Sequence, residues 1–144
     1  MYIYSNRGEK RMSYLQNVKF HFDNVHKWAP LHFGPILLHQ VGDLICDQDF
    51  ENGLHTQECY ELTYIATGRG TCFTRGKYYD VRQGDVFILR TGDHHNIKSD
   101  NEAPLRFFYC GFDFDETDPR MSVFYPIREL LDSADMPLAS DKFN

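Results

Sequence analysis

The sequence predicts an all-β fold, a double-stranded β-helix or jelly-roll barrel with an N-terminal arm and one short C-terminal helix. From Ile36 to Phe114, short apolar or alternating segments follow one another, which is typical of β-strands. Turns that contain glycine separate these segments at the spacing expected of a sandwich or barrel. After Pro119 the apolar residues are instead spaced three and four apart, which indicates a helix.

Each expected strand ends at a turn signal. Glycine stands in nearly all of these turns, as in Gly42-Asp43, Arg75-Gly76 and Gly84-Asp85. The expected strands cover residues 36–41, 44–46, 60–67, 71–74, 78–81, 86–90 and 105–114.

Three segments divide the chain. The first is polar and irregular, and Pro30 together with Gly34 and Pro35 at its end prevents a long helix there. The last contains apolar residues at helical spacing, Phe124, Ile127, Leu130 and Leu131, and we expect the helix to end near Pro137. The predicted boundaries are 1–34 for the arm, 35–118 for the barrel and 119–144 for the helix and tail.

The chain length and charge limit the range of functions. A chain of 144 residues suits one domain with one core. The net charge is −6, and the Lys and Arg residues are scattered, so the sequence offers no basic face for phosphate groups. We expect no DNA-binding domain in this chain, and contact with DNA only through a further C-terminal domain.

The cysteines and the N-terminus predict a cytoplasmic protein. The four cysteines, Cys46, Cys59, Cys72 and Cys110, form no CxxC pair and no zinc-finger spacing, which favours a reducing compartment. The first residues lack the apolar centre of a signal peptide, and no apolar run is long enough to span a bilayer. We therefore expect no membrane partner.

Two spaced patterns lie in the middle of the chain. The first contains His55, Gln57, Glu61 and Gly68, and the second contains Gly84, Arg90, Gly92, His95 and Ser99. They resemble the paired cupin signatures, HxH-x3-4-E-x6-G and G-x5-PxG-x2-H-x3-N, in every spacing. Gln57 replaces the second His of that pattern, Arg90 replaces the Pro, and Ser99 replaces the Asn.

The amino-acid sequence around these positions resembles the N-terminal sensor domain of AraC-type transcription regulators over about residues 35–115. The matching segments are Tyr60-Glu61-Leu62, Gly84-Asp85-Val86-Phe87, Gly92-Asp93 with His95, and Pro104-Leu105-Arg106. The resemblance implies a homodimeric domain that binds a small-molecule effector, such as a sugar or related polar metabolite. It also implies a helix-turn-helix module after this domain, so the chain resembles a sensor without its output module.

Polar residues at the centre of the first pattern form the candidate site. Along an unbroken strand His55, Gln57 and Glu61 share one face, and if that face is interior these groups need partners. With His95 they predict either a divalent metal site (Fe, Mn, Ni or Zn, with Gln57 as a weaker ligand) or the polar lining of an organic-ligand site. A third interpretation is that these groups only bond to one another or to the backbone.

Three further residues are candidates for contact with a ligand: Tyr64, Arg75 and Arg90. Two classes of function remain at this stage. A ligand-sensing regulatory domain is preferred, because Gln57 weakens the metal-ligand set. The alternative is a small metal-dependent cupin enzyme, an isomerase or dioxygenase. The sequence contains no pattern of a nucleophilic triad, so we predict no catalytic residue.

Overall fold

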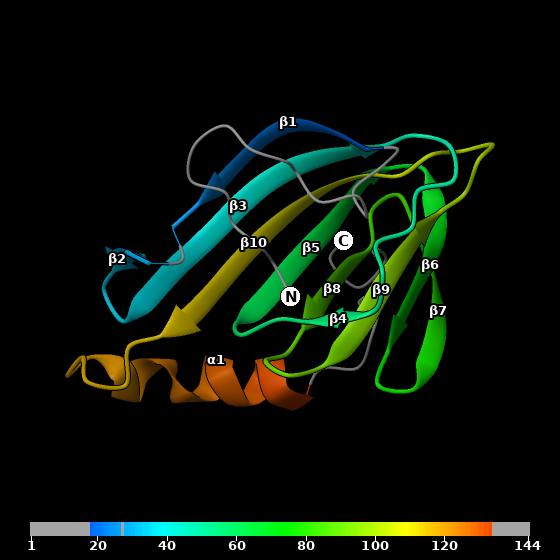
Figure 1. Ribbon diagram of the computed structural model, residues 1–144. Coiled ribbons are helices and arrows are strands. Elements are labelled where there is room, and N and C mark those ends of the chain that lie inside the picture. The colour runs from blue at the N-terminus through cyan, green and yellow to red at the C-terminus, as the bar shows by residue number, and fades with distance from the viewer. Residues whose placement is uncertain (1–17, 27, 134–144) are drawn as a thin grey trace.

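Two antiparallel sheets face each other in the computed structural model, which describes residues 18–26 and 28–133 (Figure 1). The larger sheet has the strand order β1-β3-β10-β5-β8, with β2 paired to β3. Its strands are β1 (Val18–Val25), β2 (Leu31–Phe33), β3 (Ile36–Cys46), β5 (Tyr60–Thr67), β8 (Val86–Leu89) and β10 (Arg106–Phe114).

The smaller sheet has the order β4-β9-β6-β7 and closes the other side of the barrel (Figure 1). Helix α1 (Met121–Ser133) lies across one end of the strands. The strands of this sheet are β4 (His55–Thr56), β6 (Arg69–Thr74), β7 (Lys77–Arg82) and β9 (His94–Ser99). This arrangement confirms the predicted all-β barrel with one C-terminal helix.

The core lies between the sheets because apolar residues alternate along the strands. Ile65, Phe87 and Leu89 on the larger sheet are fully buried, and Val81 and Ile97 on the smaller sheet are buried as well. Side chains at every second position of a strand share a face, so one face of each sheet supplies this core. Burial of such side chains stabilises the fold by about 1.5 to 3 kcal/mol each.

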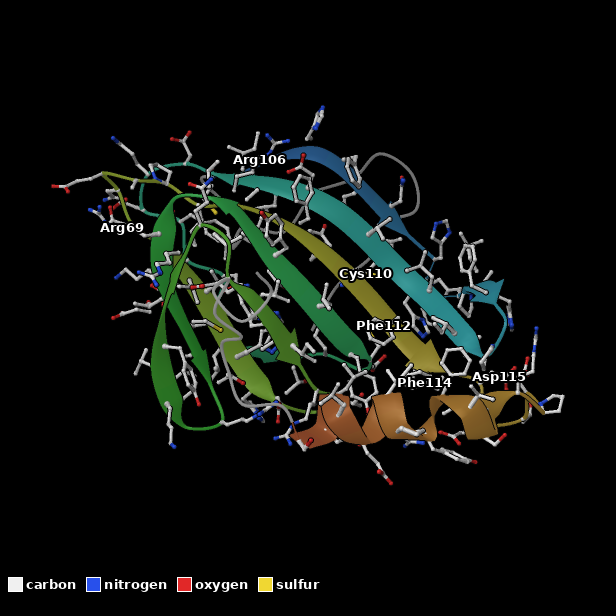
Figure 2. The ribbon with its side chains drawn as sticks, turned by 180° about the vertical axis from the view of Figure 1, so that it is seen from behind. Arg69, Arg106, Cys110, Phe112, Phe114 and Asp115 are labelled. Atoms are coloured by element: carbon white, nitrogen blue, oxygen red, sulfur yellow. The ribbon has the colours of Figure 1, made fainter. Side chains whose placement is uncertain are left out.

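Helix α1 is anchored by its buried face and by aromatic rings of the larger sheet. Met121 and Leu131 are buried against the core. Phe112 and Phe114 lie at the end of β10 nearest α1 (Figure 2), and both rings contact Tyr60, at 5.8 and 5.9 Å between centroids. No helix in the described part of the chain is both long enough and apolar enough to cross a membrane.

Two turns require backbone conformations that favour glycine. Arg75 and Gly76 both have positive φ values, 51° and 75°, as a two-residue hairpin between β6 and β7 requires. Gly68 has φ 83°, and a Cβ atom there would lie 2.1 Å from the carbonyl oxygen of Pro104. The turns predicted at these positions are therefore present.

The strands differ from the prediction in several places. Strand β3 continues through Gly42 and Asp43, where a break was expected, because the ring of Tyr109 packs over Gly42 and leaves no space for a Cβ atom. Strand β9 was not predicted, since its sequence begins with polar residues. Strands β1 and β2 occupy part of the segment that was expected to be an irregular arm.

Candidate functional site

The larger sheet carries a buried carboxylate at its interior face. Glu61 on β5 is 5% exposed, and its Oε2 accepts hydrogen bonds from the side-chain amides of Gln40, at 3.1 Å, and Gln57. Its Oε1 accepts a weaker bond from Thr63, at 3.3 Å. A Cβ atom on Gly111 would lie 2.6 Å from Cγ of Gln40, so the glycine on β10 lets Gln40 reach across to Glu61.

The surroundings of Glu61 favour its protonated form. Burial raises the pKa of Glu61 from its ordinary 4.5 to about 7, while the hydrogen bonds from Thr63 and Gln40 lower it in part. Its hydrogen bonds from Gln40, Gln57 and Thr63 come from two amides and a hydroxyl, which are all uncharged donors. The group can therefore exchange a proton near neutral pH.

The smaller sheet carries two histidines at its interior face. His55 on β4 is the cross-strand partner of His95 on β9, and their ring centroids are 4.2 Å apart. His95 is 1% exposed, whereas His55 is only half-buried. On the other side of His95, Thr74 of β6 is its cross-strand partner and is fully buried.

Backbone carbonyls orient both imidazole rings. Nδ1 of His55 lies 2.7 Å from the carbonyl oxygen of Gly53, and Nδ1 of His95 lies 3.0 Å from that of Asp93. A carbonyl oxygen only accepts, so each Nδ1 carries the proton and each Nε2 presents a lone pair. Burial lowers the pKa of His55 and, with the neighbouring His55 ring, lowers the pKa of His95 to about 4, so both rings are neutral at pH 7.

The structure brings these predicted residues together in a different way from the one expected. The chain leaves the strand conformation between Thr56 and Tyr60, so His55 belongs to the smaller sheet and Glu61 to the larger one. The expectation of one unbroken strand is wrong, and the two groups lie on facing sheets instead of one face. Gln57, in the intervening loop, contacts Glu61.

Arg75 and Arg90 lie beside this group rather than within it. Both donate to the same carboxylate oxygen of Asp93, at 2.9 and 3.1 Å. Arg90 also donates to the backbone oxygen of Asp132, at 2.6 Å, near the end of α1. The two arginines therefore connect the turn before His95 with the hairpin after Thr74 and with the helix.

Tyr64 is not brought to the group. It alternates with Thr63 and Ile65 and so points to the outer face of the larger sheet. There it is 40% exposed and stacks on Phe108, with ring centroids 6.4 Å apart. The period of two, applied from Glu61, would have excluded this residue.

Three residues of the group were missed in the sequence. Thr63 follows Glu61 by two positions, and the alternation places it on the same face, but it was not chosen as a candidate site residue. Gln40 is a polar residue in an apolar strand, which is a weaker signal. Thr74 has no sequence signal, because only the pairing of β6 with β9 places it beside His95.

The metal-ligand set predicted from His55, Glu61 and His95 is only partly assembled. Two neutral imidazoles protonated at Nδ1 have the chemistry of metal ligands. Both oxygens of Glu61 are instead engaged by amide and hydroxyl donors. Among the described residues no group of three or more His, Cys, Asp or Glu side chains is placed to hold a metal ion.

A hollow lies at the end of the smaller sheet that is distant from Thr74 and His95. It is a depression of about 650 Å³ whose lining includes Arg69, Arg82 and Lys98. Arg69 is paired with Asp100 and Glu102, at 3.2 and 3.0 Å, so much of its charge is already balanced. The interior group is the better candidate site because it is buried and spans both sheets.

Comparison with solved structures identifies the fold class. The chain is similar to the cupin domain of Cnp3 from Schizosaccharomyces pombe, with TM-score 0.51 and 16% identity, covering 84% of this chain and 75% of that one. It is also similar to the plu4264 protein from Photorhabdus luminescens, with TM-score 0.52 and 15% identity over 90% of this chain and 98% of that one. These likenesses show a cupin barrel.

The family follows from the sequence comparisons. Residues 39–119 match the model of the AraC-like ligand binding domain, and the chain belongs to that family. The chain thus carries a ligand-sensing domain of the kind found in AraC-type transcription regulators, as the resemblance predicted.

The curated relatives include regulators and a binding protein. The raffinose operon transcriptional regulatory protein RafR of Pediococcus pentosaceus is 33% identical over 61 residues, 42% of this chain and 22% of that protein. The HTH-type transcriptional regulator YfiF of Bacillus subtilis is 32% identical over 44% of this chain and 19% of its own length. An oxalate-binding protein of Thermotoga maritima is 34% identical over 38% of this chain and 46% of its own. The chain therefore spans half or less of the relatives that it matches.

Proposed function

We propose that the interior group of Gln40, Gln57, Glu61, Thr74, His55 and His95 binds a polar organic effector, a sugar or related metabolite, and that the domain acts in the cytoplasm. The observation that carries the proposal is the buried Nε2 of His95, which has no hydrogen-bond partner among the described residues. Buried polar atoms nearly always have a hydrogen-bond partner, so the unpaired Nε2 of His95 indicates that a ligand atom supplies the partner. The similarity to RafR, a regulator of a raffinose operon, supports a sugar-like effector.

Contacts between the strands of the interior group and helix α1 support a response of the helix to the effector. The hydroxyl of Tyr60, the residue before Glu61, donates to the carboxylate of Asp132 at 2.7 Å. Arg90 donates to the carboxylate of Asp93 and also to the backbone oxygen of Asp132. Movement at either side of the interior group would thus change the contacts of the last helical turn, and an effector that prefers one helix position would shift its population.

The test is a thermal melt with a set of polar metabolites. We expect at least one sugar or related compound to raise the melting temperature of the wild type, because a ligand that binds only the folded state stabilises it. Glu61→Ala should abolish that increase while the protein still folds. Tyr64→Ala, on the outer face of the same strand, is the matched control and should keep the increase. Failure of every such compound with the wild type contradicts the proposal.

The alternative function is a small metal-dependent cupin enzyme, and the two oriented, neutral imidazoles favour it. His55 and His95 would hold a divalent ion together with Gln57, and the ion would polarise a bound substrate. Metal content of the purified protein, followed by melts with and without a chelator, separates the two functions. If the purified protein contains stoichiometric metal and a chelator lowers its melting temperature, the enzyme becomes the preferred function and the effector-binding domain the alternative.

We further propose that the domain forms a homodimer through α1. Val123, Ile127 and Leu130 are 73, 47 and 65% exposed, and their spacing of four and three places them on one face of the helix. The sequence offers four aromatic residues, Tyr2, Tyr4, Phe124 and Tyr125, as further candidates for this contact. Phe124 packs against the core, Tyr125 is 47% exposed, and Tyr2 and Tyr4 lie outside the described residues. Sedimentation should show a dimer that Ile127→Glu dissociates, and a wild type that stays monomeric at high concentration contradicts this.

A further inference from the structure

Two buried polar atoms on cross-strand partners of the smaller sheet have no hydrogen-bond partner among the described residues. They are Oγ1 of Thr74 and Nε2 of His95, and the two residues are 0 and 1% exposed. Thr74 and His95 are directly opposite each other on β6 and β9. They share the interior face with Cys72 and Ile97, two residues of the core. One small group between the strands could therefore contact both atoms.

The hydrogen bond at the far side of the His95 ring fixes what this group must be able to do. Nδ1 carries its proton toward the carbonyl oxygen of Asp93, 3.0 Å away, so Nε2 can only accept. The neighbouring ring of His55 is held in the same way by Gly53, at 2.7 Å. Thr74 can donate or accept. The missing partner must donate to His95, and it can accept from Thr74.

A hydroxyl group meets both demands without a charge. A carboxylate could accept from Thr74, but it has no proton for His95 and would place a negative charge beside two nitrogen lone pairs. An ammonium group could donate to both atoms, but it would bring a positive charge into a buried position, which is costly without a close counter-charge. The carboxylate of Glu61 already accepts bonds from Gln40, Gln57 and Thr63.

We propose that Thr74 and His95 form a subsite for one hydroxyl group of the effector, and that this subsite excludes a carboxylate at the same position. The inference rests on the proposed function, since it names the chemistry of the same interior group. It assigns a specificity-determining role to Thr74, which lies outside the sequence pattern that contains the histidines.

The first test uses the protein without effector. Thr74→Val keeps the shape of the side chain and removes only the unpaired hydroxyl, so the variant should melt at or above the wild-type temperature. Thr71→Val on the same strand, where residue 71 faces the opposite side of the sheet, is the matched control. A Thr74→Val melt clearly below both other proteins would show that the hydroxyl has a structural partner, such as a bound water, and would overturn the subsite.

The second test uses matched ligands. The probes are pentoses, hexoses and hexitols, each paired with the aldonate or uronate of the same carbon number, and binding is measured by calorimetry. We expect the neutral compound of the best pair to bind, its carboxylate to bind at least tenfold more weakly, and Thr74→Val to lose roughly tenfold in affinity for the neutral compound. A deoxy analogue that lacks the recognised hydroxyl should bind the wild type and Thr74→Val equally.

The outcomes separate the two proposals. If an effector binds and Glu61→Ala abolishes its binding, but Thr74→Val binds it as tightly as Thr71→Val does, the subsite is wrong and the proposed function stands. If the carboxylate of a pair binds more tightly, the subsite is also wrong. If none of the compounds binds the wild type, the proposed function fails and the subsite with it.

Discussion

Asp43 and Glu61 are both buried carboxylates on the larger sheet, but they face opposite sides of it. Asp43 on β3 is 1% exposed and accepts two bonds from the guanidinium of Arg106, at 3.0 and 2.6 Å, and lies 3.0 Å from Nδ1 of His21. Glu61 on β5 is 5% exposed, and amides and a hydroxyl surround it. Figure 2 shows Arg106 near the end of β10 that is distant from α1.

The partners of the two carboxylates decide their protonation. The hydrogen bond from Arg106 holds the pKa of Asp43 below its ordinary value in spite of its burial. Burial without a cation raises the pKa of Glu61 to about 7. Asp43 therefore forms a structural ion pair with Arg106. Glu61, in contrast, can change its charge near neutral pH, as a group that binds a ligand can require. A pKa near neutral pH suits the ligand-binding role that we propose for Glu61, whereas the lowered pKa of Asp43 suits a structural role.

Removal of the Asp43 charge should have the largest effect on stability. We expect Asp43→Asn to lower the free energy of unfolding by about 2 to 3 kcal/mol at pH 7, because bonds to a charged group are lost. Arg106 is partly exposed and can turn toward water, which keeps the loss below that of a fully buried pair.

The pH dependence checks the cause of this loss. The pKa of Asp43 is lowered in the folded state, so its stabilisation is present above the unfolded pKa and disappears as the pH falls through the folded one. Urea unfolding should therefore show wild type and Asp43→Asn converging at low pH. The exposed Asp80→Asn is the control, and a difference that persists at low pH would mean that shape, not charge, is responsible.

Glu61 should give the opposite pH profile. Its folded pKa is about 7 and its ordinary value is 4.5, so the folded state binds more protons between these values and stability falls as the pH rises. We expect the wild type to lose about 2 kcal/mol from pH 5 to pH 8 through this group, and Glu61→Gln to lose much less. Urea unfolding at the two pH values measures it. Parallel profiles for the two proteins would show that Glu61 is ionised throughout.

From the sequence, Glu61 could be predicted as a site residue, but the structural role of Asp43 could not be predicted. Glu61 was selected because its spacing from His55 and Gly68 matches a known pattern. Asp43 was expected in a turn, since Gly42-Asp43 is a local turn signal; the packing of Tyr109 on Gly42 and the pairing with Arg106 outweigh that signal. The partners of both groups come from strands distant in the sequence, and local patterns contain no information on such contacts.

In the barrel as a whole, too, local sequence patterns predict the strands but not the contacts between distant strands. Its strands and turns between residues 60 and 89 follow from alternation and glycine positions, because these are local properties. The contact of His55 with His95 depends on the pairing of β4 with β9, and the place of Thr74 depends on the pairing of β6 with β9. Gln40 reaches Glu61 only because residue 111 on the strand between them is glycine. These contacts required the three-dimensional structure.

A cation placed beside Glu61 should make it resemble Asp43. Gln40→Lys puts an ammonium group near Oε2, so the pKa of Glu61 should fall well below 7 and the loss of stability between pH 5 and pH 8 should disappear. The net stability should change by only about 1 kcal/mol, since the cost of burying the ammonium offsets the attraction. Carbon NMR titration of the Glu61 carboxyl group measures the pKa. Gln40→Met, which removes one donor without adding a charge, should raise it, and a pKa that stays near 7 in Gln40→Lys contradicts the explanation.

The exposed partner of Asp43 should have the smallest effect. His21 on β1 is 68% exposed, and an ion pair with so exposed a group contributes little because water and salt screen it. We expect His21→Ala to lower the free energy of unfolding at pH 6 by about 0.5 kcal/mol, and high salt to reduce that difference further. Arg106 keeps two bonds to Asp43 in this variant, so the ion pair itself should survive. Urea unfolding at low and high salt, compared with Asp43→Asn, measures both effects. A loss as large as that of Asp43→Asn would show that β1, not Arg106, keeps Asp43 buried and charged.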